Sequence, residues 1–303
     1  MVHRRARTLA CSIGTLLALT GCDRDAQTLP APAIDAAQAE NVEPAHGTHP
    51  HFSLADEGQA REPFKVFDNL YFVGIEYVAS WLLVTDAGLI LIDSLFGDEE
   101  YLDYLLGNIR TLGFDPADLE YIVLTQGHPD HYGQAFSLRD VTGAVIGTGR
   151  GDWELIENDL WSTIAPRRGW VIEDGETLTL GDTRIEFMIT PGHTSGTVSL
   201  EFPVVDGDES YRAFLAGGTS VRSHDPDVLN RFIDDMERIK RIEGIDVQIN
   251  NHPFIDDLFA RQRLLGNREE GTTHPFVSRE NFVAFVDYRI RVAEDQLQVI
   301  MED

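Results

Sequence analysis

Three histidine-bearing loops, each directly after an apolar strand-like run, constrain the fold of this chain more than any other feature. The runs YIVLT, IEFMI and DVQIN are followed in turn by QGHPDH at 126–131, TPGH at 190–193 and NHP at 251–253. In the first loop, His128, Asp130 and His131 fall within four positions, which is rarely a packing arrangement, and a turn lets alternate side chains converge on one point. Imidazole nitrogen and carboxylate oxygen suit zinc. The three loops together therefore predict a metal site.

The alternative interpretation of the first loop is a polar turn in which Asp130 caps a helix. This interpretation accounts for Asp130 but for neither histidine. Taken alone, His193 or His252 would be an ordinary loop histidine with satisfied hydrogen bonds. Because all three loops occur in one chain, the metal site is the favoured hypothesis.

The chain from Phe64 onward consists of two successive halves, in which strands come first and helices follow. In the first half, strands are expected between Phe64 and about residue 93 and at 121–125, and the spacing of apolar residues between 101 and 112 predicts a helix. The second half is expected to contain strands near 170–172, 177–180, 184–190, 197–202, 211–216 and 246–250, and helices near 225–243, 256–265 and 279–299. Two sheets with helices on their outer faces fit this order, which predicts an α/β fold.

The charge balance is strongly acidic and excludes several classes of partner. The 303 residues include 51 Asp and Glu against 24 Lys and Arg, for a net charge of −27. Such a surface repels phosphate backbones and anionic lipid headgroups. Nucleic acid is therefore not expected as a partner, and membrane attachment is expected only through a lipid anchor. The sequence points to a small-molecule substrate and does not predict the oligomeric state.

The N-terminus has the pattern of an export signal. A basic stretch precedes the apolar run 9–19, which has the length of a secretory h-region and is too short to span a bilayer. The run ends in Leu-Thr-Gly-Cys22, which resembles a bacterial lipobox. Residues 1–21 are therefore expected to be a lipoprotein signal peptide and Cys22 the lipidated residue, with an ordinary signal peptide as the alternative. Asp23 resembles an inner-membrane retention signal, so the expected location is the periplasmic face of that membrane.

The segment 22–60 is expected to consist of the lipidated cysteine and a flexible linker, because it is rich in Ala, Pro and Gln and lacks periodicity. The folded domain is expected over residues 61–303. Cys11 and Cys22 are the only cysteines in the sequence, and neither would belong to the domain. The domain is therefore expected to have no disulfide and no thiolate ligand.

In their order and spacing, the histidine loops resemble the metallo-β-lactamase superfamily from about Phe64 to the C-terminus. The family signature is H-x-H-x-D-H, then P-G-H-T and a last His after a strand, and this chain has Q-x-H-x-D-H at 126–131, PGHT at 191–194 and His252. The chain is most similar to the subclass without a cysteine ligand. The resemblance implies a single-domain αββα sandwich with two zinc ions in a groove at one edge of the paired sheets. It assigns Gln126, His128 and His193 to the first zinc, and Asp130, His131 and His252 to the second.

Two positions depart from the family pattern. Gln126 replaces a histidine, and its neutral amide oxygen is expected to bind the first zinc more weakly. Gly218 stands where many relatives have a bridging Asp or a Ser, and it offers no ligand. The resemblance also implies that Asp93 supports the metal loop by hydrogen bonds. Ser220 and Arg222 would bind a substrate carboxylate, with loop capping and surface charge as the alternatives.

The resemblance implies a zinc-dependent hydrolase in which a metal-bound hydroxide opens a cyclic amide, that is, a β-lactamase. Asp130 is expected to ligate the second zinc and to orient the hydroxide. The first alternative is a zinc hydrolase of lactones or other esters, because the fold alone does not determine the substrate. The second alternative is a membrane-tethered binding protein with a degenerate metal site, for which Gln126 and Gly218 are the motivation.

Overall fold

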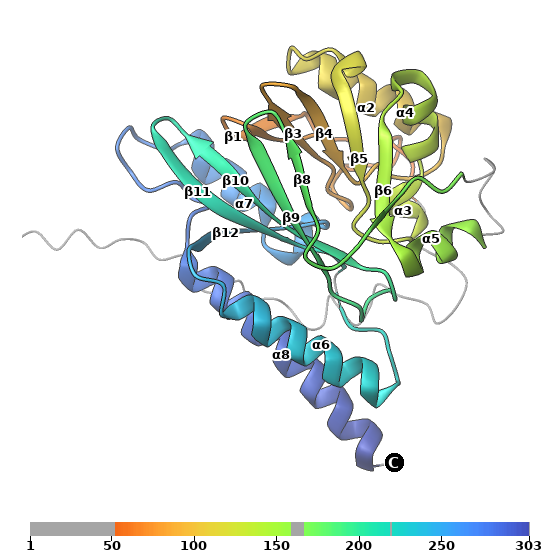
Figure 1. Ribbon diagram of the computed structural model, residues 1–303. Helices are drawn as coiled ribbons and strands as arrows, with labels where there is room; N and C mark the ends of the chain where they lie inside the picture. Colours follow the sequence, from red (N-terminus) through yellow and green to blue (C-terminus); the bar gives the residue numbers. More distant parts are fainter. Residues whose placement is uncertain (1–51, 159–166, 219, 303) are drawn as a thin grey trace, which may run out of the picture. The chain divides into compact units, whose positions relative to one another are not determined.

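The computed structural model of the protein describes residues 52–158, 167–218 and 220–302 (Figure 1). The described residues contain a seven-stranded sheet, in which the strands lie in chain order. Its strands are β1 (Phe64–Phe67), β2 (Leu70–Phe72), β3 (Trp81–Thr85), β4 (Gly88–Ile92), β5 (Leu119–Val123), β6 (Val145–Gly149) and β7 (Trp170–Ile172). The strands β1 to β4 pair antiparallel, whereas β4 to β7 are parallel.

A second, five-stranded sheet has the order β12-β11-β10-β9-β8. Its strands are β8 (Thr177–Leu180), β9 (Thr183–Ile189), β10 (Val198–Asp206), β11 (Glu209–Ala216) and β12 (Ile245–Asn250). Neighbours pair antiparallel from β8 to β11, and β11 and β12 are parallel. The parallel step needs a crossover, which is supplied by the helix between these two strands.

The helices of the first half are α2 (Glu99–Thr111), α3 (Pro129–Tyr132), α4 (Ala135–Thr142) and α5 (Arg150–Glu157). Those of the second half are α6 (Pro226–Lys240), α7 (Leu258–Gly266) and α8 (Arg279–Glu302), and the short 3-10 turns are η1 (Pro116–Asp118) and η2 (Pro253–Ile255). The local sequence of α6 explains why a helix is predicted there. Asp225 accepts a hydrogen bond from the Asp227 N–H at 2.9 Å, Pro226 occupies the first turn, and the buried stripe recurs every three or four residues.

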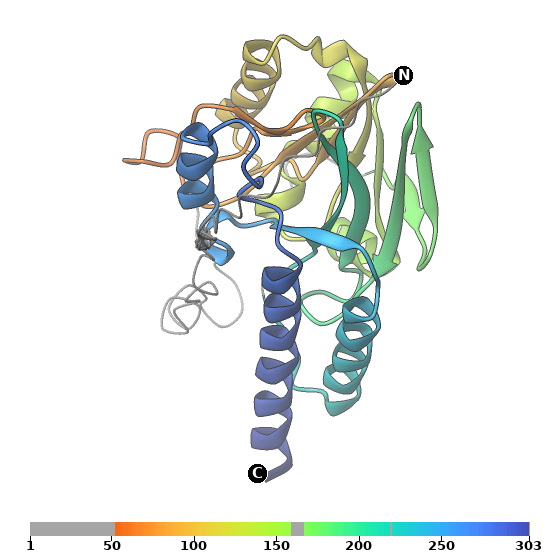
Figure 2. The ribbon, with the colours of Figure 1, turned by 90° about the vertical axis from the view of Figure 1, so that its left-hand side faces the viewer.

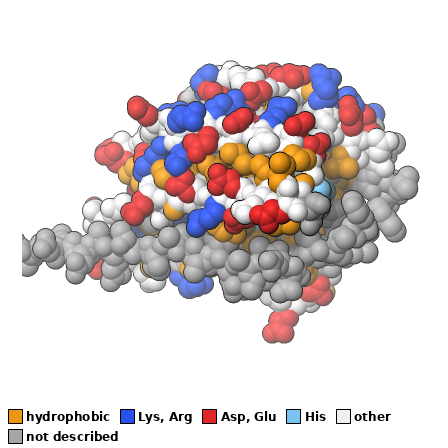
Figure 3. All heavy atoms as spheres, turned by 90° about the horizontal axis from the view of Figure 1, so that it is seen from below, with side chains coloured by type: hydrophobic (Ala, Val, Ile, Leu, Met, Phe, Trp, Pro, Cys, Tyr) orange, Lys and Arg blue, Asp and Glu red, His pale blue; other side chains and the backbone are white. Residues whose placement is uncertain are grey.

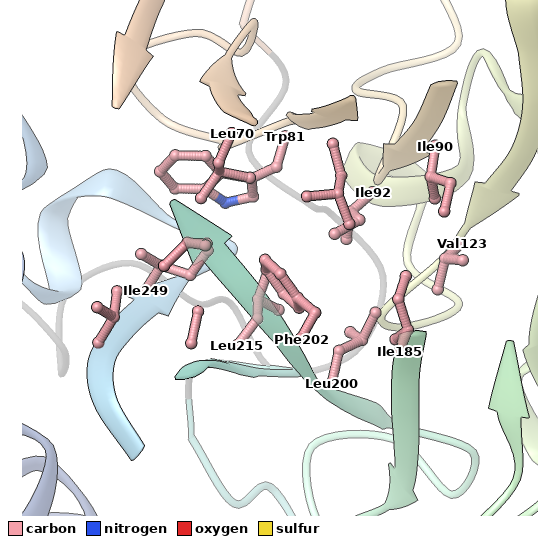
Figure 4. Packing of buried hydrophobic residues seen from close by; sticks show 14 of the residues in the cluster. Leu70, Trp81, Ile90, Ile92, Val123, Ile185, Leu200, Phe202, Leu215 and Ile249 are labelled. Carbon is pink, nitrogen blue, oxygen red and sulfur yellow. The ribbon is translucent and has the colours of Figure 1, made fainter. Parts of the chain in front are cut away.

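The main hydrophobic core lies between the two sheets (Figure 4). Side chains of β2 to β5 point toward side chains of β9 to β12, and the contributing residues labelled there are Leu70, Trp81, Ile90, Ile92, Val123, Ile185, Leu200, Phe202, Leu215 and Ile249. All ten side chains are buried. Removal of this much apolar surface from water is the main force that holds the two sheets together.

Helices cover the outer face of each sheet. The helices α2, α4 and α5 pack on the first sheet through a second apolar cluster, and α6 and α8 pack on β11 and β12 through a third. Figures 1 and 2 show α6 and α8 side by side. The α/β class and the αββα layers expected from the sequence are therefore confirmed.

The folded region begins earlier than the sequence predicts. Residues 52–60 were expected in the linker, but Phe52 and Leu54 pack against the apolar cluster under α2. The Tyr101 hydroxyl donates to the Phe52 carbonyl at 2.5 Å, and the Glu100 carboxylate accepts from the Leu54 N–H at 2.8 Å. Two apolar side chains and these hydrogen bonds order the segment, so the domain extends at least to Phe52 rather than starting at 61. The predicted leader 1–21, Cys22 and Asp23 lie outside the described residues.

Among the described helices, none combines the length and the apolarity needed to cross a membrane. Figure 3 shows one face of the molecule, on which acidic and basic side chains surround a band of hydrophobic side chains with a histidine beside it.

Candidate metal centre

The segments that carry the candidate ligands follow strands of both sheets. The first loop continues from β5, whereas His193 and His252 follow β9 and β12 of the other sheet. Pro129 opens α3 immediately after His128, whose backbone is extended, so Asp130 and His131 lie on one short helical turn. The fold thus brings three loops, widely separated in the sequence, to one place.

Asp130, His131 and His252 form the Asp-His-His set. One ligand atom from each lies within 4.8 Å of the other two, and all three side chains are buried. The His131 Nε2 is 3.2 Å from the His252 Nε2. The Asp130 Oδ2 is 3.3 Å from the His131 Nε2 and 3.7 Å from the His252 Nε2. Two imidazole nitrogens and one carboxylate oxygen therefore face a common point, as in a zinc site with three protein ligands.

Gln126, His128 and His193 form the Gln-His-His set beside it. The His128 Nδ1 is 3.2 Å from the His193 Nε2 and 2.5 Å from the Gln126 Oε1. The Gln126 amide nitrogen is 2.7 Å from the His131 Nε2, so this amide lies between the two sets. The structure thus brings together all six side chains that the sequence assigns to metal binding.

The outer nitrogens of three histidines are held by oxygen acceptors. The His131 Nδ1 is 2.7 Å from the Asp93 Oδ2. The His193 Nδ1 is 2.9 Å from the Ser220 carbonyl oxygen, and the His252 Nδ1 is 2.7 Å from the Tyr77 carbonyl oxygen. A ring whose Nδ1–H donates outward presents the lone pair of Nε2 inward, which is the tautomer that binds a metal. The donor set and its tautomers therefore fit zinc.

Asp93 is the most constrained of these acceptors. It is fully buried, and its carboxylate also accepts from the Thr125 N–H at 2.7 Å and the Thr125 hydroxyl at 2.8 Å. Its backbone has a φ of 61°, in the left-handed region that non-glycine residues rarely adopt. Such backbone strain persists where surrounding contacts determine the conformation, as the three donors do here.

The electrostatics of the Asp-His-His set favour a cation. Burial lowers the pKa of His252 to about 3 and that of His193 well below its ordinary value, so both rings are neutral. Burial also opposes charge on His131, but the carboxylates of Asp130 and Asp93 outweigh it and raise the pKa of His131 to about 10. Burial opposes ionisation of Asp130, and the neighbouring His131 nevertheless holds its pKa well below the usual range. A metal ion and a proton therefore compete for His131.

Gly218 has a steric role that the sequence did not reveal. It has a φ of 75°, and a Cβ atom at this position would lie 2.4 Å from the His193 Cβ. The backbone thus passes directly against the His193 side chain, and an Asp or Ser side chain does not fit at this position with the present backbone.

Ser220 and Arg222 contact the same loop through their backbones. The Ser220 carbonyl accepts from His193, and the Arg222 N–H donates to the Gly192 carbonyl at 2.9 Å. The Arg222 side chain is partly buried, which lowers its pKa to about 10. A role of either side chain in binding substrate stays a prediction.

Three further residues near the site were missed from the sequence. The buried Asp152 accepts from the Thr194 hydroxyl at 2.9 Å, and burial raises its pKa to about 7. Arg289 of α8 is buried and donates to the Gly218 carbonyl at 2.7 Å, and Tyr77 holds His252. No local motif marks any of them, because each acts through a residue distant in the sequence.

Comparison with known proteins finds similarity to one superfamily. Residues 73–206 match the family model described as the metallo-beta-lactamase superfamily. The crystal structure of BJP-1, a subclass B3 metallo-beta-lactamase of Bradyrhizobium japonicum, superposes with a TM-score of 0.71 at 26% identity over 82% of this chain and 98% of that chain. The class B3 di-zinc metallo-beta-lactamase LRA-12 from an Alaskan soil metagenome gives a TM-score of 0.68 at 23% identity, over 82% of this chain and 98% of that one.

Curated relatives are more varied. A hydroxyacylglutathione hydrolase of Mesorhizobium japonicum is 30% identical over 99 residues, which are 33% of this chain and 34% of the relative. The chain spans about half the length of the curated relatives it matches.

Proposed function

We propose that the chain is a β-lactamase of the metallo-beta-lactamase superfamily that uses two zinc ions, because residues 73–206 match the model of that superfamily and the fold matches a subclass B3 member. The observation that carries the proposal is the pair of facing ligand sets within a fold that matches a subclass B3 metallo-beta-lactamase over 98% of its length. The absence of cysteine from the sequence after Cys22 agrees with an Asp-His-His set as the second site.

Zinc bound by the two sets would polarise a carbonyl group and acidify water near neutral pH. The protein supplies orientation and charge. Asp93, the Tyr77 carbonyl and the Ser220 carbonyl fix the rings of His131, His252 and His193. Asp130 contributes the negative charge of the site and can accept a hydrogen bond from an attacking water.

Substrate binding is assigned to the loop after Gly218. The Arg222 backbone N–H donates to the Gly192 carbonyl, next to His193. The guanidinium charge of Arg222 is among the causes that lower the pKa of His252, and a guanidinium near the ligands would suit a substrate carboxylate. A carboxylate next to the cyclic amide is common to penicillins, cephalosporins and carbapenems. Ser220 would donate a hydrogen bond to the same carboxylate.

The second candidate function is hydrolysis of a lactone or another ester. The 30% identity to a hydroxyacylglutathione hydrolase favours it, because that relative acts on a substrate that is not a β-lactam. The export signal predicted from the sequence favours the first candidate. We propose that Cys22 is lipidated and that the protein works at the periplasmic face of the inner membrane, where β-lactams act.

The test is hydrolysis of a penicillin, a cephalosporin, a carbapenem, an acyl lactone and a thioester by the purified, zinc-loaded chain, with and without a chelator. Chelator-sensitive opening of a β-lactam is the expected result. His252→Ala should abolish it, whereas His224→Ala, which removes an exposed histidine outside both sets, should leave it unchanged. Turnover of the lactone or thioester alone would replace the first candidate by the second.

A further inference from the structure

Two aromatic side chains flank His252 at the Asp-His-His set. The Phe254 ring lies 5.1 Å from the His252 ring between centroids, and the Tyr77 ring lies 5.0 Å from it on a near-perpendicular plane. The Tyr77 and Phe254 rings are 5.8 Å apart. The three rings therefore form one continuous aromatic surface, which we call the Tyr77–Phe254 platform.

Phe254 is unusual because it is exposed between buried neighbours. Its side chain is 42% exposed, whereas Pro253 and Ile255, on either side in η2, are buried. A large ring that stays in water contributes little to the core, and burying it would be favourable. The Phe254 ring thus contacts His252 and Tyr77 but keeps part of its surface in water, and a bound apolar group would cover that part.

Tyr77 makes the platform rigid. Its carbonyl accepts from His252, its ring is 4.6 Å from the Phe52 ring, and a hydrogen bond from the Ile75 N–H to the Val78 carbonyl closes the turn that carries it. A preformed aromatic surface binds a flat ligand without the cost of ordering its own side chains.

The position of the platform determines which part of a substrate it can reach. His252 belongs both to the platform and to the Asp-His-His set, and its Nε2 is 3.7 Å from the Asp130 Oδ2. Phe254 contacts the His252 ring but is not itself a member of the ligand set, so a group that binds to it belongs to a part of the substrate outside the reacting amide. In penicillins, the acyl side chain is such a part, and it can carry an aromatic ring.

We propose that the Tyr77–Phe254 platform binds an aromatic substituent on the acyl side of the substrate and so selects for substrates that carry one. This inference rests on the proposed hydrolase function and adds a specificity-determining surface to it. Aromatic pairs prefer offset-stacked or edge-to-face contacts at centroid separations of about 4.5–7 Å, which a phenyl group against Phe254 can adopt.

The test uses benzylpenicillin and 6-aminopenicillanic acid, which share the bicyclic ring and differ only in the phenylacetyl group. In Phe254→Ala, KM for benzylpenicillin should rise about 10-fold with kcat nearly unchanged, while KM for 6-aminopenicillanic acid should stay within about 2-fold. Phe254→Trp should restore the low KM. The matched control is Leu264→Ala, which truncates an apolar residue that is also 42% exposed but lies on α7. This variant should leave KM unchanged for both substrates.

Equal changes of KM for both penicillins, or no change for either, would overturn the platform while leaving the β-lactamase function intact. If neither penicillin is hydrolysed, the β-lactamase proposal is wrong, and the same variants are measured with N-phenylacetyl and N-acetyl homoserine lactone. Saturation-transfer NMR gives a readout independent of turnover. Phenyl protons should receive the strongest transfer from the wild-type protein and lose it in Phe254→Ala, and the absence of phenyl transfer for both phenylacetyl compounds would refute the inference.

Discussion

Replacing Gly218 with alanine tests how closely the backbone is packed against the metal centre. A Cβ atom at this position would lie 2.4 Å from the Cβ and 2.7 Å from the Cγ of His193. The His193 Cβ is attached directly to the backbone, and its ring is held by the Ser220 carbonyl at 2.9 Å. A change of rotamer therefore cannot relieve the contact, and one of the two backbone segments has to move.

The expected cost has two parts. An alanine in the left-handed region, at a φ of 75°, costs about 1–2 kcal/mol. Overpacking of a tightly packed site costs about 1–3 kcal/mol more. The sum of about 2–5 kcal/mol is large against the usual stability of a domain, about 5–15 kcal/mol. It corresponds to a fall in Tm of about 4–20 °C for a domain of this size.

Thermal unfolding of the metal-free Gly218→Ala variant measures this cost. Zinc titration measures the effect of the substitution on the Gln-His-His set, whose affinity for zinc should fall because His193 is displaced. Gly207→Ala is the first control, since Gly207 has a φ of 62° but open space around it, and it isolates the conformational part. Gly107→Ala in α2, where a Cβ meets nothing within 4 Å, should be stabilising by about 0.5–1 kcal/mol. The reasoning is refuted if Gly218→Ala costs no more than Gly207→Ala.

Asp93→Ala removes the acceptor that orients His131 and should lower zinc affinity about 10–100-fold. Competition with a chromophoric chelator measures this affinity, and an unchanged value would contradict the orienting role of Asp93. Asp256→Ala leaves the buried Arg261 guanidinium without the carboxylate that lies 2.7 Å from it, so the free energy of unfolding measured in urea should fall by about 3–5 kcal/mol. The double variant Asp256→Ala/Arg261→Met should recover part of this loss. A single variant as stable as the wild type would contradict the predicted role of the ion pair. Burial raises the pKa of Asp152 from 3.8 to about 7, so the folded state binds its proton more tightly than the unfolded state. The stabilisation that comes from this bound proton is complete below about pH 4 and is lost as the pH rises through about 7. The free energy of unfolding of metal-free Asp152→Asn should therefore fall less than that of the wild type between about pH 5 and pH 8. Parallel pH profiles of the two proteins would contradict this expectation.

The parts of the site that the sequence predicts are those encoded locally. Residues 126–131 follow an apolar run that forms β5, and their order is visible without any knowledge of the fold. The helix α6 was expected over 225–243 and is observed over Pro226–Lys240, because a cap, a proline and an apolar stripe all lie within the segment. Short-range physics determines these features, so a single sequence is enough to find them.

The residues that the sequence did not predict act across long separations in the chain. Asp152 bonds to Thr194, 42 positions away, and Arg289 to the Gly218 carbonyl, 71 positions away. The Tyr77 carbonyl accepts from His252, 175 positions away. Backbone carbonyls and a buried carboxylate have no sequence signature, since any residue has a carbonyl and the partner is determined only when the sheets pack.

Formation of the metal centre depends on the packing of the two sheets, because its ligands come from both. The hydrogen bonds that join the sheets lie next to the ligands. The Val198 N–H donates to the Thr125 carbonyl at 2.8 Å, the Asn251 amide donates to the Thr125 hydroxyl at 3.0 Å, and the Trp81 indole donates to the Asn250 carbonyl at 2.9 Å. Thr125 and Asn251 immediately precede Gln126 and His252. A metal ion bound by both loops therefore stabilises the same interface that these bonds close, and the free energy of metal binding adds to that of sheet packing.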